Sequence, residues 1–218
     1  EGFLGINIGP NKETKNKEED YYICLSRLSM FAGYITINIS SPNTEGLRDF
    51  HDQGELKKLL TGLTKIIKEK KIKCPIAIKI SPDIKDNEIS KIVDLVSSYN
   101  INGIIVSNTT DSHRDNLSDT KKHETGGLSG QPLKDISTKL IKKFYRETKG
   151  KIKIIGVGGV DSGQSAYEKI TAGADAIQLY TGMVYKGPGI VKEIKKDLIS
   201  ILKKEKIKNI SEAVGINA

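Results

Sequence analysis

The sequence has few of the residues that build cross-links or base-stacking surfaces. None of its 218 residues is Trp and only 6% are aromatic, so no platform for stacking nucleic-acid bases stands out. Its two cysteines, Cys24 and Cys74, lie outside any CxxC motif and have no His at ligand spacing. We predict that both are reduced thiols of the core, and we predict no metal site.

Long apolar runs are also absent. No stretch of about eighteen consecutive apolar residues occurs, so the sequence predicts no membrane-spanning helix. The first residues, Glu1 to Gly5, lack an initiator Met and a basic segment, and they lead directly into a predicted core strand. We therefore expect a further segment to precede Glu1 in the full gene product.

Positive charge is abundant, with a net charge of +8 at pH 7. Such a charge is compatible with nucleic acid or with an anionic membrane surface. The lysines, however, alternate with glutamates and with apolar residues at core spacing, which is typical of solvated helix faces. We therefore expect no nucleic-acid partner. His51, His113 and His123 fall in polar segments, and we predict surface positions without a catalytic or ligand role for them.

Short β-rich runs alternate with amphipathic helical stretches along the whole chain, which predicts an α/β fold with a parallel sheet. No linker or repeat interrupts the pattern, so we predict one domain over residues 1–218. The predicted strands cover residues 3–8, 34–39, 76–80, 103–107, 152–157 and 176–180. The predicted helices cover residues 17–30, 55–70, 87–98, 135–148, 164–172 and 191–204.

Polar residues or glycines follow nearly every predicted strand. A site assembled from the ends of many strands is typical of a (βα)₈ barrel, whereas a Rossmann site draws mainly on one or two loops. We therefore predict a (βα)₈ TIM barrel with about six of its eight βα units in this chain. The residues concerned are Asn7, Asn38, Ser40, Ser41, Lys79, Ser107, Asn108, Gly158, Gly159, Tyr180 and Thr181.

Three features of these strand ends suggest a bound ligand. Glycine-bearing turns after the last two strands allow backbone N–H groups to approach a phosphate, although such turns also occur without a ligand. Lys79 stands inside an apolar strand, where its charge needs an anion or a strong acceptor such as a reduced flavin. Asn7, Asn38, Asn43 and Asn108 favour a planar polar ligand with several carbonyl and N–H groups, of which a pyrimidine is an example.

Several segments then occur in the order and spacing of dihydroorotate dehydrogenases. The sequence resembles the C-terminal two thirds of a class 2, quinone-dependent member of that family. The segments are LGINIGPNK (4–12), YITINISSPNTEGLRDF (34–50), IAIKISPD (76–83), GIIVSNTT (103–110), GGLSGQPLKD (126–135), IIGVGGVDSG (154–163), AGADAIQLYTGMVYKGP (172–188) and the ending ISEAVG (210–215).

The resemblance implies a role for each matching position. It implies that FMN contacts Asn7, Lys79, Ser107, Gly130, Gly158, Gly159, Tyr180 and Thr181. It implies that Asn38, Asn43, Asn108 and Thr109 hold the substrate, (S)-dihydroorotate, which is oxidised to orotate in de novo pyrimidine (UMP) biosynthesis.

Ser41 matches the base that removes the C5 proton, while hydride passes from C6 to N5 of FMN. Serine is a weak base, and Thr44 matches a residue that relays the proton through a water. Class 1 enzymes carry Cys at this position, so Ser41 implies class 2, with a ubiquinone-type membrane quinone as electron acceptor. The implied location is peripheral on a membrane, and we favour the cytoplasmic face of a bacterial inner membrane over the mitochondrial inner membrane.

The sequence departs from the family at its beginning. Absent are two barrel strands, an N-terminal helical pair with the quinone tunnel and the membrane-docking surface, an FMN-contacting lysine and a substrate-binding asparagine. An alternative is therefore a truncated or split-gene product that folds without activity. Because an open parallel sheet is incomplete as a barrel, we expect this chain alone to bind FMN weakly and to turn over little.

Two other families of barrel are less compatible with these residues. A tRNA dihydrouridine synthase uses a Cys as its acid, and neither Cys24 nor Cys74 follows a strand end as Ser41 does. A flavin-free, phosphate-binding isomerase barrel is disfavoured by Lys79 in combination with the asparagines.

Overall fold

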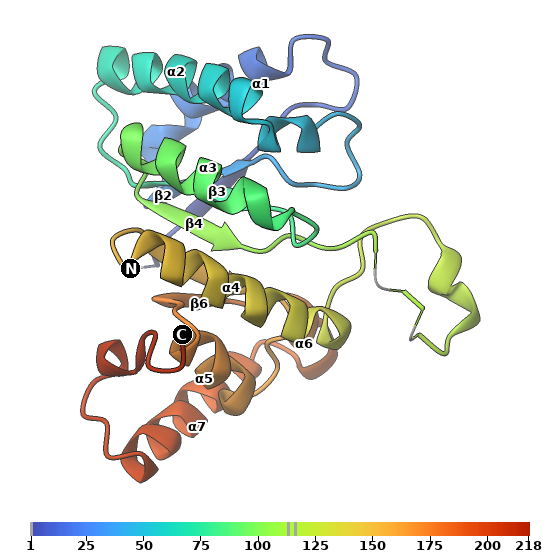
Figure 1. Cartoon of the computed structure of the whole chain (residues 1–218), viewed down its shortest axis with the longest axis vertical. Helices are drawn as coiled ribbons and strands as arrows, with labels where there is room; N and C mark the ends of the chain where they lie inside the picture. Colours follow the sequence, from blue (N-terminus) through green and yellow to red (C-terminus); the bar gives the residue numbers. More distant parts are fainter. Residues whose placement is uncertain (1, 113, 116) are drawn as a thin grey trace.

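The computed structural model describes residues 2–112, 114–115 and 117–218 (Figure 1). Its six strands form one parallel sheet whose spatial order follows the chain, β1-β2-β3-β4-β5-β6. This confirms the predicted α/β fold, a partial (βα)₈ barrel with six of the eight strands. The strands are β1 (Gly5–Ile8), β2 (Tyr34–Asn38), β3 (Ile76–Ile80), β4 (Gly103–Val106), β5 (Lys153–Val157) and β6 (Ala176–Gln178).

The helices follow the same order as the strands. In Figure 1 they succeed one another from α1 and α2 at the top of the view to α5 and α7 at the bottom. From α1 to α5, each helix contacts the next helix along the chain, as expected when consecutive βα units lie side by side, whereas α7 packs mainly on α5, past the short α6. They are α1 (Lys17–Leu28), α2 (Gln53–Lys70), α3 (Asp86–Ser98), α4 (Lys134–Thr148), α5 (Gly163–Thr171), α6 (Thr181–Lys186) and α7 (Ile190–Lys204).

Helix α2 shows how sequence sets the bounds of an element. Its N-cap Asp52 accepts hydrogen bonds from the N–H groups of Gly54 and Glu55, and the helix ends at Lys71 in the left-handed conformation. Leu56, Leu59, Leu60 and Leu63 fall on one stripe and are fully buried. Each such leucine contributes about 2 kcal/mol of transfer free energy, so the stripe fixes the helix against the sheet.

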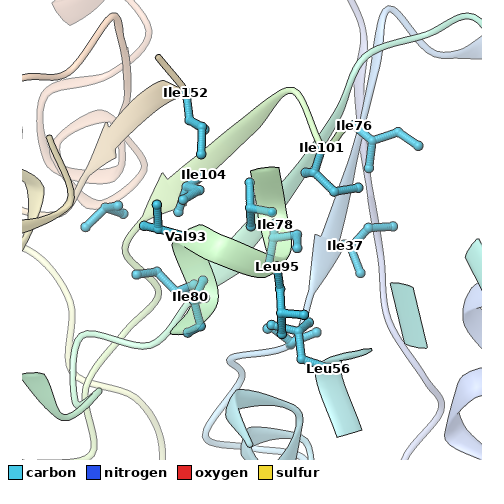
Figure 2. Close-up of a cluster of buried hydrophobic side chains, with 14 of the residues drawn as sticks. Ile37, Leu56, Ile76, Ile78, Ile80, Val93, Leu95, Ile101, Ile104 and Ile152 are labelled. Atoms are coloured by element: carbon cyan, nitrogen blue, oxygen red, sulfur yellow. The ribbon is translucent and has the colours of Figure 1, made fainter. Parts of the chain in front are cut away.

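The main core lies between the sheet and helices α1 to α4. Ile37, Ile78 and Ile104 come from three adjacent strands and meet Leu56 and Val93 of the helices (Figure 2). A smaller cluster, Val160, Ala166, Ile190 and Ile194, packs α5 against α7. The strands are therefore covered by helices on one face, which leaves their carboxyl ends and the loops that follow free to build a site.

Several predictions of element bounds and burial need correction. The last strand ends at Gln178, before the predicted Tyr180, and the short helix α6 follows where none was predicted. The prediction of a surface position for His51 is wrong, because its side chain is only 7% exposed. His123 is exposed as predicted, and His113 lies outside the described residues.

The two cysteines are free and half-buried, and both pack against the core. Burial raises the pKa of each thiol. Among the described residues, no helix is both long and apolar enough to cross a membrane. Within the same ranges, no group of three or more His, Cys, Asp or Glu side chains could hold a metal ion.

Candidate active site

A pocket of about 350 Å³ lies beyond the carboxyl ends of β3, β4, β5 and β6. Its volume falls within the usual range for small-molecule sites, about 300–1,000 Å³. The four strands bring together residues that are far apart in the sequence, because parallel strands all end at the same rim. The predicted site residues that line this pocket are Lys79, Ser107, Asn108, Thr109, Gly130, Gly158, Gly159, Tyr180 and Thr181.

Lys79 points from the end of β3 into this pocket and is half-buried. Burial lowers the pKa of its ammonium group. Within the part of the chain that the structure describes, the Lys79 ammonium has no carboxylate within ion-pair distance. A desolvated cation without a partner is unfavourable unless a ligand supplies negative charge or strong acceptors. The geometry therefore fits an anionic or carbonyl-rich ligand.

Glycines of two loops form one end of the pocket, and their backbone conformations are unfavourable for any residue with a side chain. Gly130, Gly158 and Gly159 have φ angles of +81°, +113° and +68°. A Cβ atom on Gly159 would lie 2.5 Å from Cβ and 2.7 Å from Cα of Lys134. These glycines allow the backbone to adopt a conformation that L side chains rarely tolerate.

The same end of the pocket offers unused hydrogen-bond donors. Among the described residues, the N–H groups of Gly159 and Thr181 donate to no protein acceptor. Thr181 Oγ1 donates to Ser129 Oγ at 2.8 Å, which joins the loop after β6 to the loop of Gly130. Free backbone N–H groups beside side-chain-free glycines are a common way to bind a phosphate. The residues present therefore fit the phosphate of FMN.

A hydrogen-bond network joins the ends of β2 and β4. The Asn108 amide donates to Asn38 Oδ1 and to Ser40 Oγ, each at 3.1 Å. Asn108 Oδ1 in turn accepts from the N–H of Thr109 at 2.8 Å. Three of the four predicted substrate-binding residues are thus connected. Asn43 is exposed and lines a neighbouring pocket of about 550 Å³ with Pro42.

The loop that carries Ser41 lies close to the main pocket. A Cβ atom on Gly127, which lines that pocket, would overlap the Thr109 hydroxyl and lie 3.1 Å from Pro42 Cγ. Ser41 is half-buried, and its Oγ accepts from the N–H of Asn43 at 3.2 Å. In the described chain no Asp, Glu, His or Lys side chain hydrogen-bonds Ser41. Thr44 is half-buried, whereas Asn7, on the edge strand β1, is exposed.

A charged network that was not predicted from the sequence holds three loops of the site together. Arg48, in the 3₁₀ helix η2 (Arg48–His51), lies 3.1 Å from Asp83 Oδ2 and 2.9 Å from Asp111 Oδ1. It also donates to the carbonyl of Thr109 at 3.4 Å. Burial alone would raise the pKa of Asp111, but the hydrogen bond from the Arg48 guanidinium brings it below its usual value.

His51 adds a second link between the same loops. Its Nδ1 lies 3.0 Å from the Arg48 carbonyl, and its Nε2 accepts from the N–H of Ser81 at 3.3 Å. Burial lowers the pKa of the imidazole, so the neutral tautomer with hydrogen on Nδ1 satisfies both partners. Arg48 lies in the motif segment LRDF, directly before His51, and Ser81 and Asp83 lie in SPD, but nothing in the sequence shows that the two segments meet.

This chain is similar to known proteins in both sequence and fold. The family model described as dihydroorotate dehydrogenase matches residues 1–202. The chain is 41% identical over 219 residues to the mitochondrial dihydroorotate dehydrogenase (quinone) of Arabidopsis thaliana, covering 98% of this chain and 48% of the plant protein. It is 44% identical over 222 residues to the dihydroorotate dehydrogenase (quinone) of Trichodesmium erythraeum, covering 97% and 58%.

A solved structure of the same family has a closely similar fold. The crystal structure of DHODH from Eimeria tenella in complex with ferulenol matches with a TM-score of 0.94 at 38% identity, over 99% of this chain and 62% of that chain. The chain thus spans between about half and three fifths of the length of these relatives. With a family match over most of its length and a shared fold, the chain belongs to the dihydroorotate dehydrogenase family.

Proposed function

We propose that this chain carries the catalytic part of a quinone-dependent dihydroorotate dehydrogenase that oxidises (S)-dihydroorotate to orotate with FMN. The observation that carries the proposal is that Lys79 and the Gly158–Gly159 loop line the same pocket. Family membership and the printed name of its relatives, dihydroorotate dehydrogenase (quinone), support the substrate and acceptor.

The residues that would hold FMN fall into two groups, one for its phosphate and one for the rest of the cofactor. The N–H groups of Gly159 and Thr181 would bind the phosphate, beside Gly130 and Gly158. Ser107, Tyr180 and the edge residue Asn7 would contact the rest of the cofactor. When bound, FMN supplies a two-electron acceptor for hydride. The Lys79 ammonium would place a fixed positive charge beside the polar edge of the ring system.

The substrate would be held by amides and hydroxyls at the neighbouring strand ends. Asn38, Asn43, Asn108 and Thr109 would bind its carbonyl and N–H groups, and the network between Asn108 and Asn38 preorganises two of them. Ser41 Oγ would take the C5 proton, and Thr44 would pass it to solvent through a water. Since no Asp, Glu, His or Lys side chain of the described residues hydrogen-bonds Ser41, fixed donors on the substrate carbonyls would acidify that proton.

The whole protein would deliver its electrons to a membrane quinone of the ubiquinone type from a peripheral position. The relatives include both mitochondrial and bacterial proteins. A bacterial inner membrane, at its cytoplasmic face, remains our proposal for the location.

The test is a dihydroorotate-to-quinone assay on the product of the whole coding sequence. Ser41→Ala should slow proton abstraction by about 100-fold or more, whereas Ser97→Ala, on the exposed face of α3, should leave the rate unchanged. An unchanged rate in Ser41→Ala would refute the assignment of the base. A wild-type protein that folds and shows neither flavin absorbance nor turnover would favour the alternative, a truncated or split-gene product without activity.

A further inference from the structure

Lys169 of α5 is a fully buried lysine outside the pocket, with 0% exposure. Its ammonium donates to Ser137 Oγ at 2.5 Å, to Thr138 Oγ1 at 2.9 Å and to the Lys134 carbonyl at 3.2 Å. All three acceptors are uncharged and belong to the first turns of α4. Three acceptors satisfy the three N–H bonds of an ammonium group, so the cation is hydrogen-bonded. Among the residues that the structure describes, no carboxylate lies within ion-pair distance of it.

The position is unfavourable for a positive charge in the protein alone. Burial is the main cause that lowers the pKa of Lys169; Glu168 and Asp135 oppose this shift and Lys134 adds to it, and together they leave the pKa at about 7. Glu168 is itself paired with Lys134 at 3.2 Å. The first turn of α4 also carries the positive end of the helix dipole, which repels a cation. A Met or Leu would fill the same space without the cost of desolvating a charge.

The turn that binds Lys169 is the same turn that supports the glycine loop of the pocket. A Cβ atom on Gly158 would lie 3.1 Å from Ser137 Oγ, and one on Gly159 would lie 2.5 Å from Lys134 Cβ. Ser137 therefore separates the Lys169 ammonium from Gly158. The Lys169 ammonium and Gly159, whose N–H donates to no acceptor among the described residues, thus both lie next to the first turn of α4.

We propose that Lys169 is a positioning residue for the phosphate group of FMN. It holds the first turn of α4 beneath the Gly158–Gly159 loop and adds a buried positive charge behind it. A bound phosphate dianion supplies the negative charge that the site otherwise lacks, and in a poorly solvated interior this attraction extends across a single layer of side chains. The proposal rests on FMN being the cofactor, and it assigns a phosphate-specific role to a residue that does not touch the ligand.

The test compares FMN with riboflavin, which has the same ring system and lacks the phosphate. Dissociation constants are measured by flavin fluorescence on the product of the whole coding sequence, for wild type, Lys169→Met and Lys169→Gln. Both variants should bind FMN about tenfold more weakly, or worse, and bind riboflavin within about twofold of wild type. Lys139→Met removes the same charge from an exposed position of α4 and should change neither constant.

Each result decides between the possible roles. Equal weakening of FMN and riboflavin would show that Lys169 only supports the fold, and it would overturn the proposal, as would unchanged binding of FMN. If Lys169→Met does not fold, Lys169→Gln carries the test, because it keeps a hydrogen-bond donor and removes only the charge. A wild-type protein that binds neither flavin would refute the proposed function itself, which is a distinguishable outcome.

Discussion

Arg48 and Asp83 form an ion pair, with 3.1 Å between the guanidinium Nη2 and the carboxylate Oδ2, that joins the loop after β2 to the loop after β3. The Arg48 side chain is 26% exposed and that of Asp83 14%. Asp83 Oδ1 also accepts a hydrogen bond from the hydroxyl of Thr110. Three loops, of which those after β2 and β4 carry candidate substrate-binding residues, therefore depend on one guanidinium.

Replacing Arg48 by Met should lower kcat by about 100-fold, because small displacements of reacting groups have effects of that order. Flavin content should be retained, since Arg48 lies outside the pocket with the glycine loops. Steady-state kinetics and the flavin spectrum would check this. Arg27→Met, exposed on α1, is the control. A variant with normal kcat would mean that the loops hold their positions without the ion pair.

Gly159→Ala should abolish FMN binding and destabilise the fold by about 2 kcal/mol or more. Two effects act together: the φ of Gly159 is +68°, which is unfavourable for a residue with a side chain, and the new Cβ would lie 2.5 Å from Lys134 Cβ. Gly189→Ala is a matched control, since Gly189 has an ordinary φ of −59° and open space around its Cβ position. Urea unfolding and flavin titration measure both effects, and equal behaviour of the two variants would contradict the strain argument.

The buried His51 should make stability depend on pH. Its pKa is lowered in the folded protein, so the unfolded chain takes up a proton first as the pH falls. The stabilising contribution is present above the unfolded pKa of about 6.5 and is lost as the pH falls from there through the folded value. Protonation of Nε2 would also break the bond from Ser81 N–H.

His51→Gln should flatten this dependence, because an amide can donate to the Arg48 carbonyl and accept from Ser81 without titrating. Free energies of unfolding measured between pH 7.5 and about 5 for both proteins would show it. Parallel curves for wild type and variant would assign the acid sensitivity to other groups.

Lys79→Met should make the bound flavin harder to reduce. Removing a desolvated cation from the pocket destabilises the more negative, reduced form, and a tenfold effect on the equilibrium corresponds to a fall of about 30 mV in a two-electron potential. Lys91→Met, exposed on α3, is the control. Redox titration of the bound flavin measures the change. An unaltered potential would place the Lys79 charge away from the ring system.

Features that depend on a local pattern of residues could be predicted from the sequence. The apolar runs that became β2 and β3, and the leucine stripe of α2, were predicted close to their observed bounds because burial on a parallel sheet demands them. Lys79 was recognisable because a charge inside an apolar strand conflicts with its surroundings. The pocket then brings Lys79 together with the glycines, as expected when all strands end at one rim.

Features that depend on distant contacts could not be predicted. His51 is buried because the N–H of Ser81, 30 residues later, and the carbonyl of Arg48 satisfy its two nitrogens. Lys169 looks like an ordinary surface lysine of an amphipathic helix until its acceptors on α4 are known. Helix α6 escaped prediction because it is a six-residue segment without buried side chains, so burial imposes no pattern on its sequence.

The agreement between strand order in space and order along the chain has a consequence for how the protein is made. Ser41 and Asn38 leave the ribosome well before Gly159 and Thr181, and each new strand pairs with the one just synthesised. Such local pairing closes only modest loops at each step. If the proposed roles hold, the residues for proton transfer lie on a growing sheet before the residues for the FMN phosphate are made, and the nascent chain would become able to hold the cofactor last.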